Sequence, residues 1–377
     1  MKRIIGVLLF LTLITSLGYY VLKNYFPNLI PPSKDIKQYL PLNVDTPSPL
    51  TVPGSYKFDT FFDLKGELPR VLTFDENGTL FASLTSSGKV VAIVDENFDL
   101  RVDKKIDVLT GLNKPHGIAF KDGYLYVAET DGVSKYPYNY KNFSVGTKQK
   151  LFDLPGGGRH FTRTIGISNN KLYTSVGSSC DTCVEKSNLR ASILVSNLDG
   201  SDLKVFAKGL RNTVFFDFDS SGKIWGTDMG RDNLGDNLPP DEVNIIEEGK
   251  DYGWPYCYGA KIKDLKFNSD RTISCEQTES PLFELPAHSA PLGFVFDSSG
   301  NAIIALHGSW NSSTKVGYKV IKLNTFAGGV SGMEDLITGF LENQDSVLGR
   351  PVGLVFDKNG RLFISDDKTG LIYIFYR

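Results

Sequence analysis

This sequence has almost no excess charge of either sign. Its 41 lysines and arginines nearly balance 43 aspartates and glutamates, which leaves a formal net charge of −2. Nucleic acids and anionic membrane surfaces are bound through basic patches, so the composition argues against both as partners. Segments with a helical pattern are also scarce, whereas aromatic residues make up 12% of the chain and glycines number 37. This combination favours β-structure with many turns.

Long hydrophobic runs are absent except at the N-terminus. Lys2 and Arg3 precede an uncharged stretch, 4–22, which is just long enough to span a bilayer as a helix. We therefore expect residues 1–26 to be a transmembrane anchor, with a cleaved signal peptide or a buried helix as alternatives. The N-terminal positive charges would stay in the cytoplasm and the body would be exported. This predicts a protein on the periplasmic or extracellular face, tethered to the membrane by this helix only.

Cysteine is scarce, and none occurs before position 180. The four cysteines are Cys180, Cys183, Cys257 and Cys275, all in the part that we expect to be exported. An even number in an exported chain predicts two disulfides. Three pairings are possible, of which the C-x-x-C spacing favours 180–183 with 257–275. A redox-active 180–183 pair is the sharper alternative, and zinc is disfavoured because no histidine stands at ligand spacing.

One pattern recurs through most of the chain. Residues 27–55 contain seven prolines and predict an extended linker. From residue 56 onward, an apolar strand, a polar turn and a second apolar strand occur six times, with the turn glycine or asparagine at 78, 123, 170, 222, 300 and 360. Tandem units of this size predict an all-β fold, a six-bladed β-propeller over 56–377. A strand-like run at 57–63 is expected to complete the last blade and close the ring.

Basic and polar residues stand immediately before each repeat. The segments that enter the innermost strands of a propeller converge on one end of its axis. The residues in these positions include Arg70, His116, His160, Arg163, Arg211, Asn212, His288 and Arg350. They predict a basic, hydrogen-bonding pocket suited to an anionic planar ligand and a polyhydroxyl substrate.

A long acidic loop follows the fourth hairpin. It begins Asp228-Met229-Gly230-Arg231-Asp232, where glycine lets backbone carbonyls turn towards an ion and the aspartates add carboxylates. Calcium prefers such oxygen ligands, so we interpret the loop as a candidate cation site, with a solvated surface loop as the alternative. Further on, the tryptophans of YGWP (252–255) and HGSW (307–310) are candidates for pocket walls.

Taken together, these motifs resemble the soluble quinoprotein glucose/sorbosone dehydrogenase family, especially its aldose sugar dehydrogenase branch. The resemblance covers about residues 57–377 in matching order. Its most specific parts are GLRN (209–212), the loop 227–244, YGWP (252–255), AHSAPLGF (287–294) and HGSWN (307–311). The family is a six-bladed propeller that uses pyrroloquinoline quinone (PQQ) and calcium to oxidise the anomeric carbon of an aldose to a lactone. This resemblance implies the same fold, both cofactors, a sugar substrate and an external electron acceptor.

The resemblance also implies roles for individual residues. His160 matches the catalytic base that takes the proton of the C1 hydroxyl while hydride passes to the quinone. Arg211 matches a residue of both the catalytic and the quinone-binding set, and the carbonyls of Gly230 and Arg231 match those that hold calcium. The other matches are Asn212, Asp241, Lys315 and Arg350 for the cofactor and Trp254 for the substrate.

Three features depart from the family pattern. His160 is followed by Phe161-Thr162-Arg163, where the family often has Gly-rich or Asn-containing residues. Arg231 stands where some members have proline, and Leu348 stands where some have a second arginine before Arg350. Two other functions remain as alternatives. A calcium-dependent propeller lactonase would need an axial metal ringed by carboxylates, whereas the strand entries here hold arginine and histidine. A non-catalytic propeller that binds a partner or glycan would need none of the catalytic residues.

Overall fold

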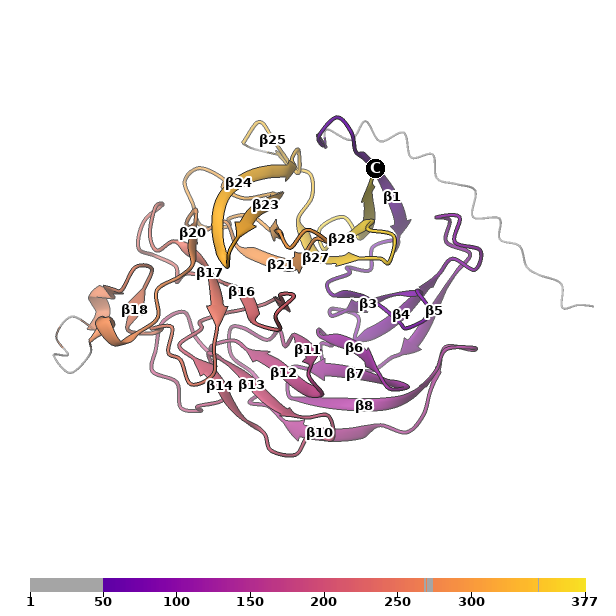
Figure 1. Ribbon diagram of the computed structural model, residues 1–377, viewed down its shortest axis with the longest axis horizontal. Coiled ribbons are helices and arrows are strands. Elements are labelled where there is room, and N and C mark those ends of the chain that lie inside the picture. Colours follow the sequence, from indigo (N-terminus) through magenta and orange to yellow (C-terminus); the bar gives the residue numbers. More distant parts are fainter. Residues whose placement is uncertain (1–49, 268, 270–273, 345) are drawn as a thin grey trace, which may run out of the picture. The chain divides into compact units, whose positions relative to one another are not determined.

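The computed structural model describes residues 50–267, 269, 274–344 and 346–377 (Figure 1). The predicted helix within 1–26, and all but the last residues of the predicted linker, lie outside the described residues. Among the described residues, no helix is long and apolar enough to cross a membrane. The prediction of an N-terminal anchor therefore stays a prediction.

Six antiparallel sheets surround a central axis, each with a path of four strands (Figure 1). The first blade comprises β2 (Leu72–Phe74), β3 (Leu80–Leu84), β4 (Lys89–Val94) and β5 (Lys104–Leu109). The second comprises β6 (Ile118–Lys121), β7 (Tyr124–Glu129), β8 (Gly132–Asn139) and β10 (Gln149–Asp153), with β9 (Ser144–Val145) paired to β8. The third comprises β11 (Ile165–Ser168), β12 (Lys171–Val176), β13 (Ser192–Asn197) and β14 (Lys204–Lys208).

The remaining blades follow the same order. The fourth comprises β15 (Phe216–Phe218), β16 (Ile224–Asp228), β17 (Asp241–Ile246) and β20 (Phe283–Leu285). The fifth comprises β21 (Pro291–Phe296), β22 (Ala302–Leu306), β23 (Lys319–Phe326) and β24 (Gly329–Ile337). The sixth comprises β27 (Pro351–Phe356), β28 (Leu362–Asp366), β29 (Leu371–Tyr376) and β1 (Lys57–Asp63). The predicted all-β six-bladed propeller is confirmed.

The ring is closed by the two ends of the propeller (Figure 1). Strand β1 pairs antiparallel with β29, from Lys57 opposite Tyr376 to Asp63 opposite Leu371. The first strand after the linker thus completes the last blade, as the sequence predicts. This pairing covers the outer edge of β29, which would otherwise expose unpaired backbone groups.

The turns between the two innermost strands of each blade explain why the repeat is visible in the sequence. All six predicted turn residues have positive φ, from 54° at Asn170 to 87° at Gly78. Glycine and asparagine tolerate this left-handed conformation better than other residues. In the first blade, Asp75 also accepts hydrogen bonds from the N–H groups of Asn77 and Thr79. The pattern D-x-x-G therefore specifies a hairpin through both backbone conformation and side-chain hydrogen bonds.

Apolar side chains of the strands fill the space between blades. The largest cluster of buried residues includes Phe81, Val127, Trp225 and Phe294 from four different blades, each at most 2% exposed.

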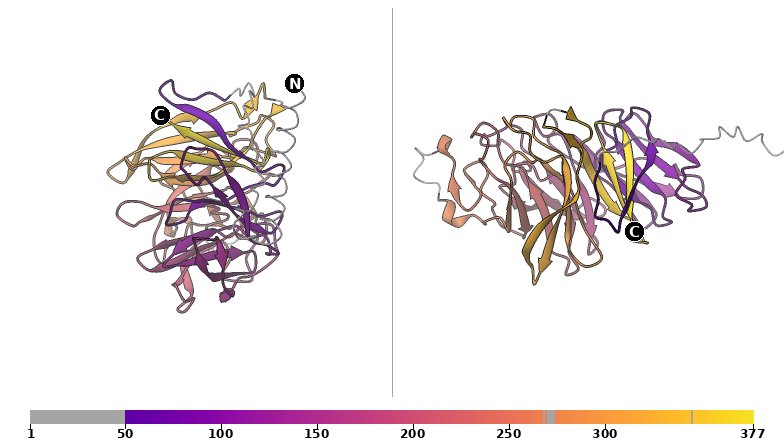
Figure 2. Two further views of the ribbon diagram at one scale, coloured as in Figure 1. Left: turned by 90° about the vertical axis from the view of Figure 1, so that its right-hand side faces the viewer. Right: turned by 90° about the horizontal axis from the view of Figure 1, so that it is seen from above.

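An insertion between β17 and β20 lies outside this core. It contains β18 (Cys257–Tyr258), β19 (Ile262–Lys263) and two 3-10 turns, η2 (Leu265–Phe267) and η3 (Cys275–Gln277). It projects from the ring in Figure 1 and in the right-hand view of Figure 2. A short pair, β25 (Leu341–Glu342) and β26 (Ser346–Val347), precedes the sixth blade.

Both disulfides have the pairing that the spacing favours. Cys180 is bonded to Cys183 in the loop between β12 and β13, and Cys257 is bonded to Cys275 within the projecting insertion. Each bond closes a local loop, so neither links two blades. We therefore expect them to order their own segments rather than to hold the propeller together.

Candidate active site

A cavity of about 470 Å³ lies where the starts of the innermost strands converge. The residues that line it include Arg70, His160, Arg211, Asn212, His288 and Arg350, which are six of the eight strand-entry residues named from the sequence. The cavity lining also includes Arg159, Gly230, Asp232, Asp241, His307, Trp310 and Asn311. The six parallel innermost strands thus bring residues that are far apart in the sequence to one end of the axis.

Two of the strand-entry residues do not line this cavity. His116 is fully buried, and its Nδ1 lies 3.1 Å from the hydroxyl of Thr164. Arg163 is also fully buried and donates to the backbone carbonyls of His160, Thr162 and Pro155. Burial, with the positive charges of Arg70 and Arg163 nearby, holds the pKa of His116 well below its usual value. Both side chains are therefore supports of the cavity wall, not parts of its surface.

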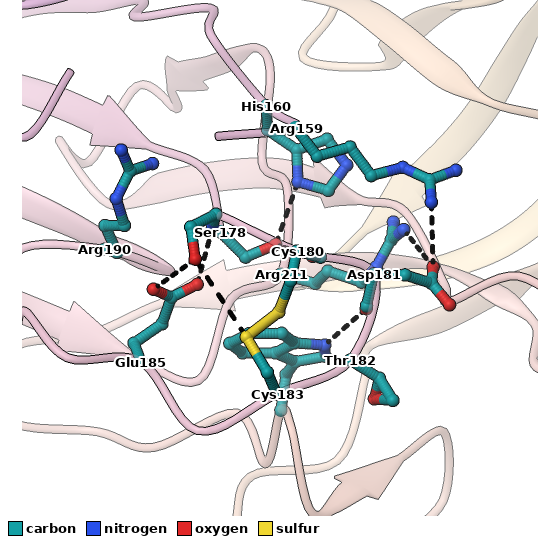
Figure 3. The surroundings of a disulfide bond; sticks show 12 residues. Arg159, His160, Ser178, Cys180, Asp181, Thr182, Cys183, Glu185, Arg190 and Arg211 are labelled. Atoms are coloured by element: carbon teal, nitrogen blue, oxygen red, sulfur yellow. Dashed lines mark hydrogen bonds and ion pairs between the residues drawn. A yellow bond between two sulfur atoms is a disulfide. The ribbon is translucent and has the colours of Figure 1, made fainter. Parts of the chain in front are cut away.

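His160 combines a cavity position with a neutral imidazole. Its Nδ1 lies 2.8 Å from the Ser178 hydroxyl (Figure 3). Burial, followed by the charges of Arg211 and Arg159, lowers the pKa of His160 to about 3. The ring is therefore uncharged at neutral pH. A neutral imidazole has one ring nitrogen with a free lone pair, which a general base requires.

The GLRN turn places Arg211 and Asn212 beside His160. The backbone N–H groups of Arg211 and Asn212 donate to the carboxylate of Asp228, at 2.8 and 2.7 Å. Asp228 ends β16, and burial raises its pKa to about 7 despite these hydrogen bonds. Gly177 permits the close approach, since a Cβ there would lie 2.6 Å from the Asn212 side-chain oxygen and 2.7 Å from the His160 Cβ.

The acidic loop is held by its own carboxylates. Asp241 accepts hydrogen bonds from the N–H groups of Gly230 and Ala290 and from the hydroxyl of Ser289. Burial raises the pKa of Asp241 to about 6, and these three donors oppose the rise. Asp232 accepts from Asn311 at 2.7 Å and pairs with Arg159. These aspartates are thus satisfied by protein groups, and the loop is not merely a solvated acidic surface.

The candidate calcium ligands in this loop are backbone oxygens. Within the described part of the chain, neither the Gly230 nor the Arg231 carbonyl accepts a hydrogen bond, so both remain available to a cation. Among the described residues, one group of histidine, cysteine or acidic side chains has its ligand atoms close enough together to share a metal. It consists of Cys180, Cys183 and Glu185. Their two sulfurs are joined in a disulfide. The carbonyls of Gly230 and Arg231 are suitable ligands for a hard cation such as calcium, which a molecule bound in the cavity would also coordinate.

Positive charge exceeds negative charge in the cavity lining. Four arginines line it together with two carboxylates, those of Asp232 and Asp241. Among the described residues, no carboxylate forms a hydrogen bond or ion pair with the Arg350 guanidinium; it donates to the carbonyls of His307 and Gly308 and to the hydroxyl of Tyr318. A half-buried guanidinium without an anion is suited to a ligand carboxylate. The arrangement therefore fits an anionic ligand.

Three residues proposed from the resemblance have side chains elsewhere. Lys315 donates to the carbonyl of Gln344 at 2.7 Å and does not line the cavity. Trp254 donates to the carbonyl of Asp181 at 3.3 Å and lines a small neighbouring cavity. The guanidinium of Arg231 pairs with Asp264, so only its backbone is a candidate ligand. For Lys315 and Trp254 the assigned roles stay predictions that this geometry does not support.

The structure also adds residues that the assigned set lacks. Trp310 lines the cavity and is 70% exposed, with the Arg159 guanidinium 5.7 Å from its ring centroid. The HGSWN motif marks this tryptophan as a candidate wall, but the motif does not distinguish it from Trp254. Ser178 and Asp181 carry no sequence signal of their own, because their role depends on a fold that brings them beside His160 and Arg211.

A six-bladed propeller with a neutral histidine, surplus arginines and free loop carbonyls at one end of its axis defines a class of protein that binds an anionic ligand there. Comparison with known proteins makes the assignment narrower. The TrAA12-like family matches residues 51–377. The chain belongs to this family, which is a family of PQQ-dependent sugar dehydrogenases.

Relatives and solved structures agree with this family. The chain is 32% identical over 356 residues to an uncharacterized protein from Borreliella burgdorferi, covering 87% of this chain and 91% of the relative. It is 26% identical over 384 residues to a PQQ-dependent sugar dehydrogenase from Hypocrea jecorina, covering 86% and 85%. Among solved structures, the holo form of the PQQ domain of Coprinopsis cinerea pyranose dehydrogenase superposes with a TM-score of 0.77 at 24% identity, covering 87% and 97%. A calcium structure of the Trichoderma reesei AA12 enzyme also has a TM-score of 0.77, at 23% identity and covering 86% and 96%. Both structural matches support the fold.

Proposed function

We propose that this protein is a PQQ-dependent oxidoreductase that converts the C1 hydroxyl of an aldose into a lactone carbonyl. The observation that carries the proposal is the position of His160, a neutral imidazole in the same cavity as Arg211, Asn212 and Arg350. Hydride transfer from an alcohol requires a base for the hydroxyl proton and a bound hydride acceptor, and this cavity offers a base beside groups that can bind an anionic cofactor. Membership of a family of PQQ-dependent sugar dehydrogenases supports the same reaction.

Cofactor binding is assigned to the arginines and the loop. PQQ is a planar tricarboxylate, and the Arg350 guanidinium, whose hydrogen bonds go to neutral acceptors in the described structure, is the best candidate partner for one of its carboxylates. Arg211 and Asn212 border the same cavity, and the carbonyls of Gly230 and Arg231 would hold calcium. When bound, PQQ accepts the hydride that leaves C1 of the sugar.

The proton is assigned to His160. As hydride leaves C1 with its electron pair, the imidazole removes the proton of the C1 hydroxyl, and the C1–O bond becomes the lactone carbonyl. An imidazole with a pKa of about 3 is always available as a base but is a weak one. Bound carboxylates would offset the positive charges of Arg211 and Arg159, which are two of the causes of the low pKa. We therefore expect cofactor binding to raise the basicity of His160 in the working enzyme.

Trp310, rather than Trp254, is assigned to the substrate. It offers an exposed aromatic face at the cavity, whereas Trp254 borders a different, smaller one. The apolar face of a pyranose packs well on such a ring, while the polar side chains around it bind hydroxyl groups. We infer that Trp310 forms one wall of the sugar site.

We also propose that the propeller lies outside the membrane, on the periplasmic or extracellular face. The two disulfides support this location, because such bonds persist in oxidising compartments. The protein would then pass its electrons to an external acceptor.

A reconstitution experiment tests the reaction. Purified apo-protein receives calcium and PQQ, and reduction of an electron-accepting dye is followed with a panel of aldoses. We expect turnover that requires both additions. His160→Gln is the matched variant, because it cannot act as a base; it should lose roughly 10²–10⁴-fold in turnover while binding PQQ with similar affinity by calorimetry. Unchanged turnover in His160→Gln would refute the assigned base, and absence of PQQ binding in the wild type would refute the reaction class.

A further inference from the structure

The loop closed by the Cys180–Cys183 disulfide contacts two functional groups of the cavity at once. It connects β12 to β13 and passes beside His160 and Arg211 (Figure 3). Within the loop, three groups accept hydrogen bonds: the carbonyl of Cys180 and both the backbone carbonyl and the carboxylate of Asp181. The disulfide therefore restricts the conformation of the residues that carry these acceptors.

The first contact reaches His160 through Ser178. The Ser178 hydroxyl lies 2.7 Å from the Cys180 carbonyl and 2.8 Å from Nδ1 of His160. A carbonyl can only accept, so the single hydroxyl proton points at Cys180 and the oxygen accepts from Nδ1–H. The opposite orientation would give up the hydrogen bond to the half-buried Cys180 carbonyl, which has no other protein donor in the described structure. This places the proton on Nδ1 and leaves the lone pair of the base on Nε2.

The second contact holds Arg211 through Asp181. The Asp181 carbonyl accepts from Nε of Arg211 at 2.9 Å, and its carboxylate accepts from Nη2 at 2.7 Å. The same carboxylate accepts from the N–H of Asp232, and the same carbonyl accepts from the indole of Trp254. One residue of the disulfide loop thus holds two sides of the guanidinium. Two acceptors on one residue fix the direction of the planar guanidinium, and the Met229 carbonyl accepts from its third side, at Nη1.

We propose that the Cys180–Cys183 loop is a positioning element that sets the tautomer of His160 and the direction of the Arg211 guanidinium together. The inference rests on the proposed dehydrogenase function, in which His160 is the base and Arg211 contacts the cofactor. Ser178 and Asp181 are positioning residues, and the disulfide keeps their acceptors in one geometry. Breaking the disulfide should therefore change base and cofactor site together, while leaving the six blades intact.

Histidine NMR of the apo-protein tests this without any turnover. In full-length protein with ¹⁵N-labelled histidine, the His160 signals, assigned with His160→Gln, should show a protonated Nδ1 and an unprotonated Nε2 at neutral pH. Ser178→Ala should lose this single tautomer, whereas Ser178→Thr, which keeps the hydroxyl, should retain it. The double variant Cys180→Ser/Cys183→Ser should lose it as well. The matched control is Cys257→Ser/Cys275→Ser, which removes the other disulfide and should leave the His160 tautomer unchanged.

Activity and binding measurements then separate the two proposals. Ser178→Ala should lower kcat roughly 10–100-fold with unchanged PQQ affinity, and the Cys180→Ser/Cys183→Ser variant should lower both. If His160 keeps its Nδ1–H tautomer in Ser178→Ala and in the double variant, the inference is overturned. If Ser178→Ala does not fold, the double variant and its control decide the question. If the tautomer behaves as expected but PQQ gives no turnover in wild-type protein, the proposed function fails and the positioning role of the loop stands.

Discussion

Acidification should destabilise this protein through His160 by an amount that can be worked out from its surroundings. In the unfolded chain the imidazole has an ordinary pKa of about 6.5. In the folded protein, burial and then the charges of Arg211 and Arg159 lower that pKa to about 3. Because the folded pKa is the lower one, the unfolded state binds more protons below about pH 6.5. The contribution of His160 to stability is therefore complete above about pH 6.5 and falls as the pH drops towards 3.

The size of this loss follows from the distance between the two pKa values. Over each pH unit in which His160 is protonated in the unfolded chain but not in the folded protein, the free energy of unfolding falls by about 1.4 kcal/mol. Between about pH 7.5 and about pH 4.5, an imidazole with these two pKa values loses about 3 kcal/mol of stabilisation. A glutamine at the same position does not titrate and loses none.

Urea unfolding of wild type and His160→Gln at these two pH values isolates the contribution of His160 to the free energy of unfolding. His116 and His307, whose pKa values are also lowered by burial, titrate in both proteins and so cancel in the comparison. We expect the free energy of unfolding to fall by about 3 kcal/mol more in the wild type than in the variant. Equal losses in the two proteins would show that His160 is not held neutral, and the argument for its role as an uncharged base would fail with it.

Three further predictions concern the cavity. Gly177→Ala would place a Cβ 2.6 Å from the Asn212 side-chain oxygen. Calorimetry should therefore show weaker PQQ binding, and urea unfolding should show a loss of stability of about 1–3 kcal/mol. Wild-type behaviour in both measurements would contradict the close packing. Arg350→Gln removes a guanidinium that has no carboxylate among its hydrogen-bond partners in the described structure, so the Kd for PQQ should rise roughly 10–100-fold. The urea midpoint should fall as well, because the His307 and Gly308 carbonyls lose their donor, and an unchanged Kd would exclude Arg350 as a cofactor contact. Trp310→Ala should raise the KM for sugar about 2–10-fold in dye-reduction assays, whereas Trp254→Phe should not; the reverse result would restore Trp254 as the substrate wall.

Much of the scaffold can be read directly from the amino-acid order. Each inner hairpin has a polar turn with a glycine or asparagine at positive φ. In four of the six hairpins the turn has the pattern D-x-x-G, in which the aspartate, as at Asp75, accepts hydrogen bonds from the turn backbone. Six such hairpins predict six blades, and the run at 57–63 supplies the strand that closes the ring. The spacing of the four cysteines also favours the pairing that is found. These features are local or repeat at a fixed interval, so they leave a pattern in the sequence.

The roles of individual side chains at the cavity depend on contacts between blades. His116 and His160 both stand at strand entries, yet the first is fully buried and the second lines the cavity. Trp254 and Trp310 both lie in aromatic motifs, yet the cavity includes only the second. Ser178 and Asp181 are partners of His160 and Arg211 through hydrogen bonds between residues that are 18 and 30 positions apart in the sequence. The chain order sets which residues reach the end of the axis, but the packing of neighbouring loops sets where each side chain points, because the acceptors that hold it come from distant parts of the sequence.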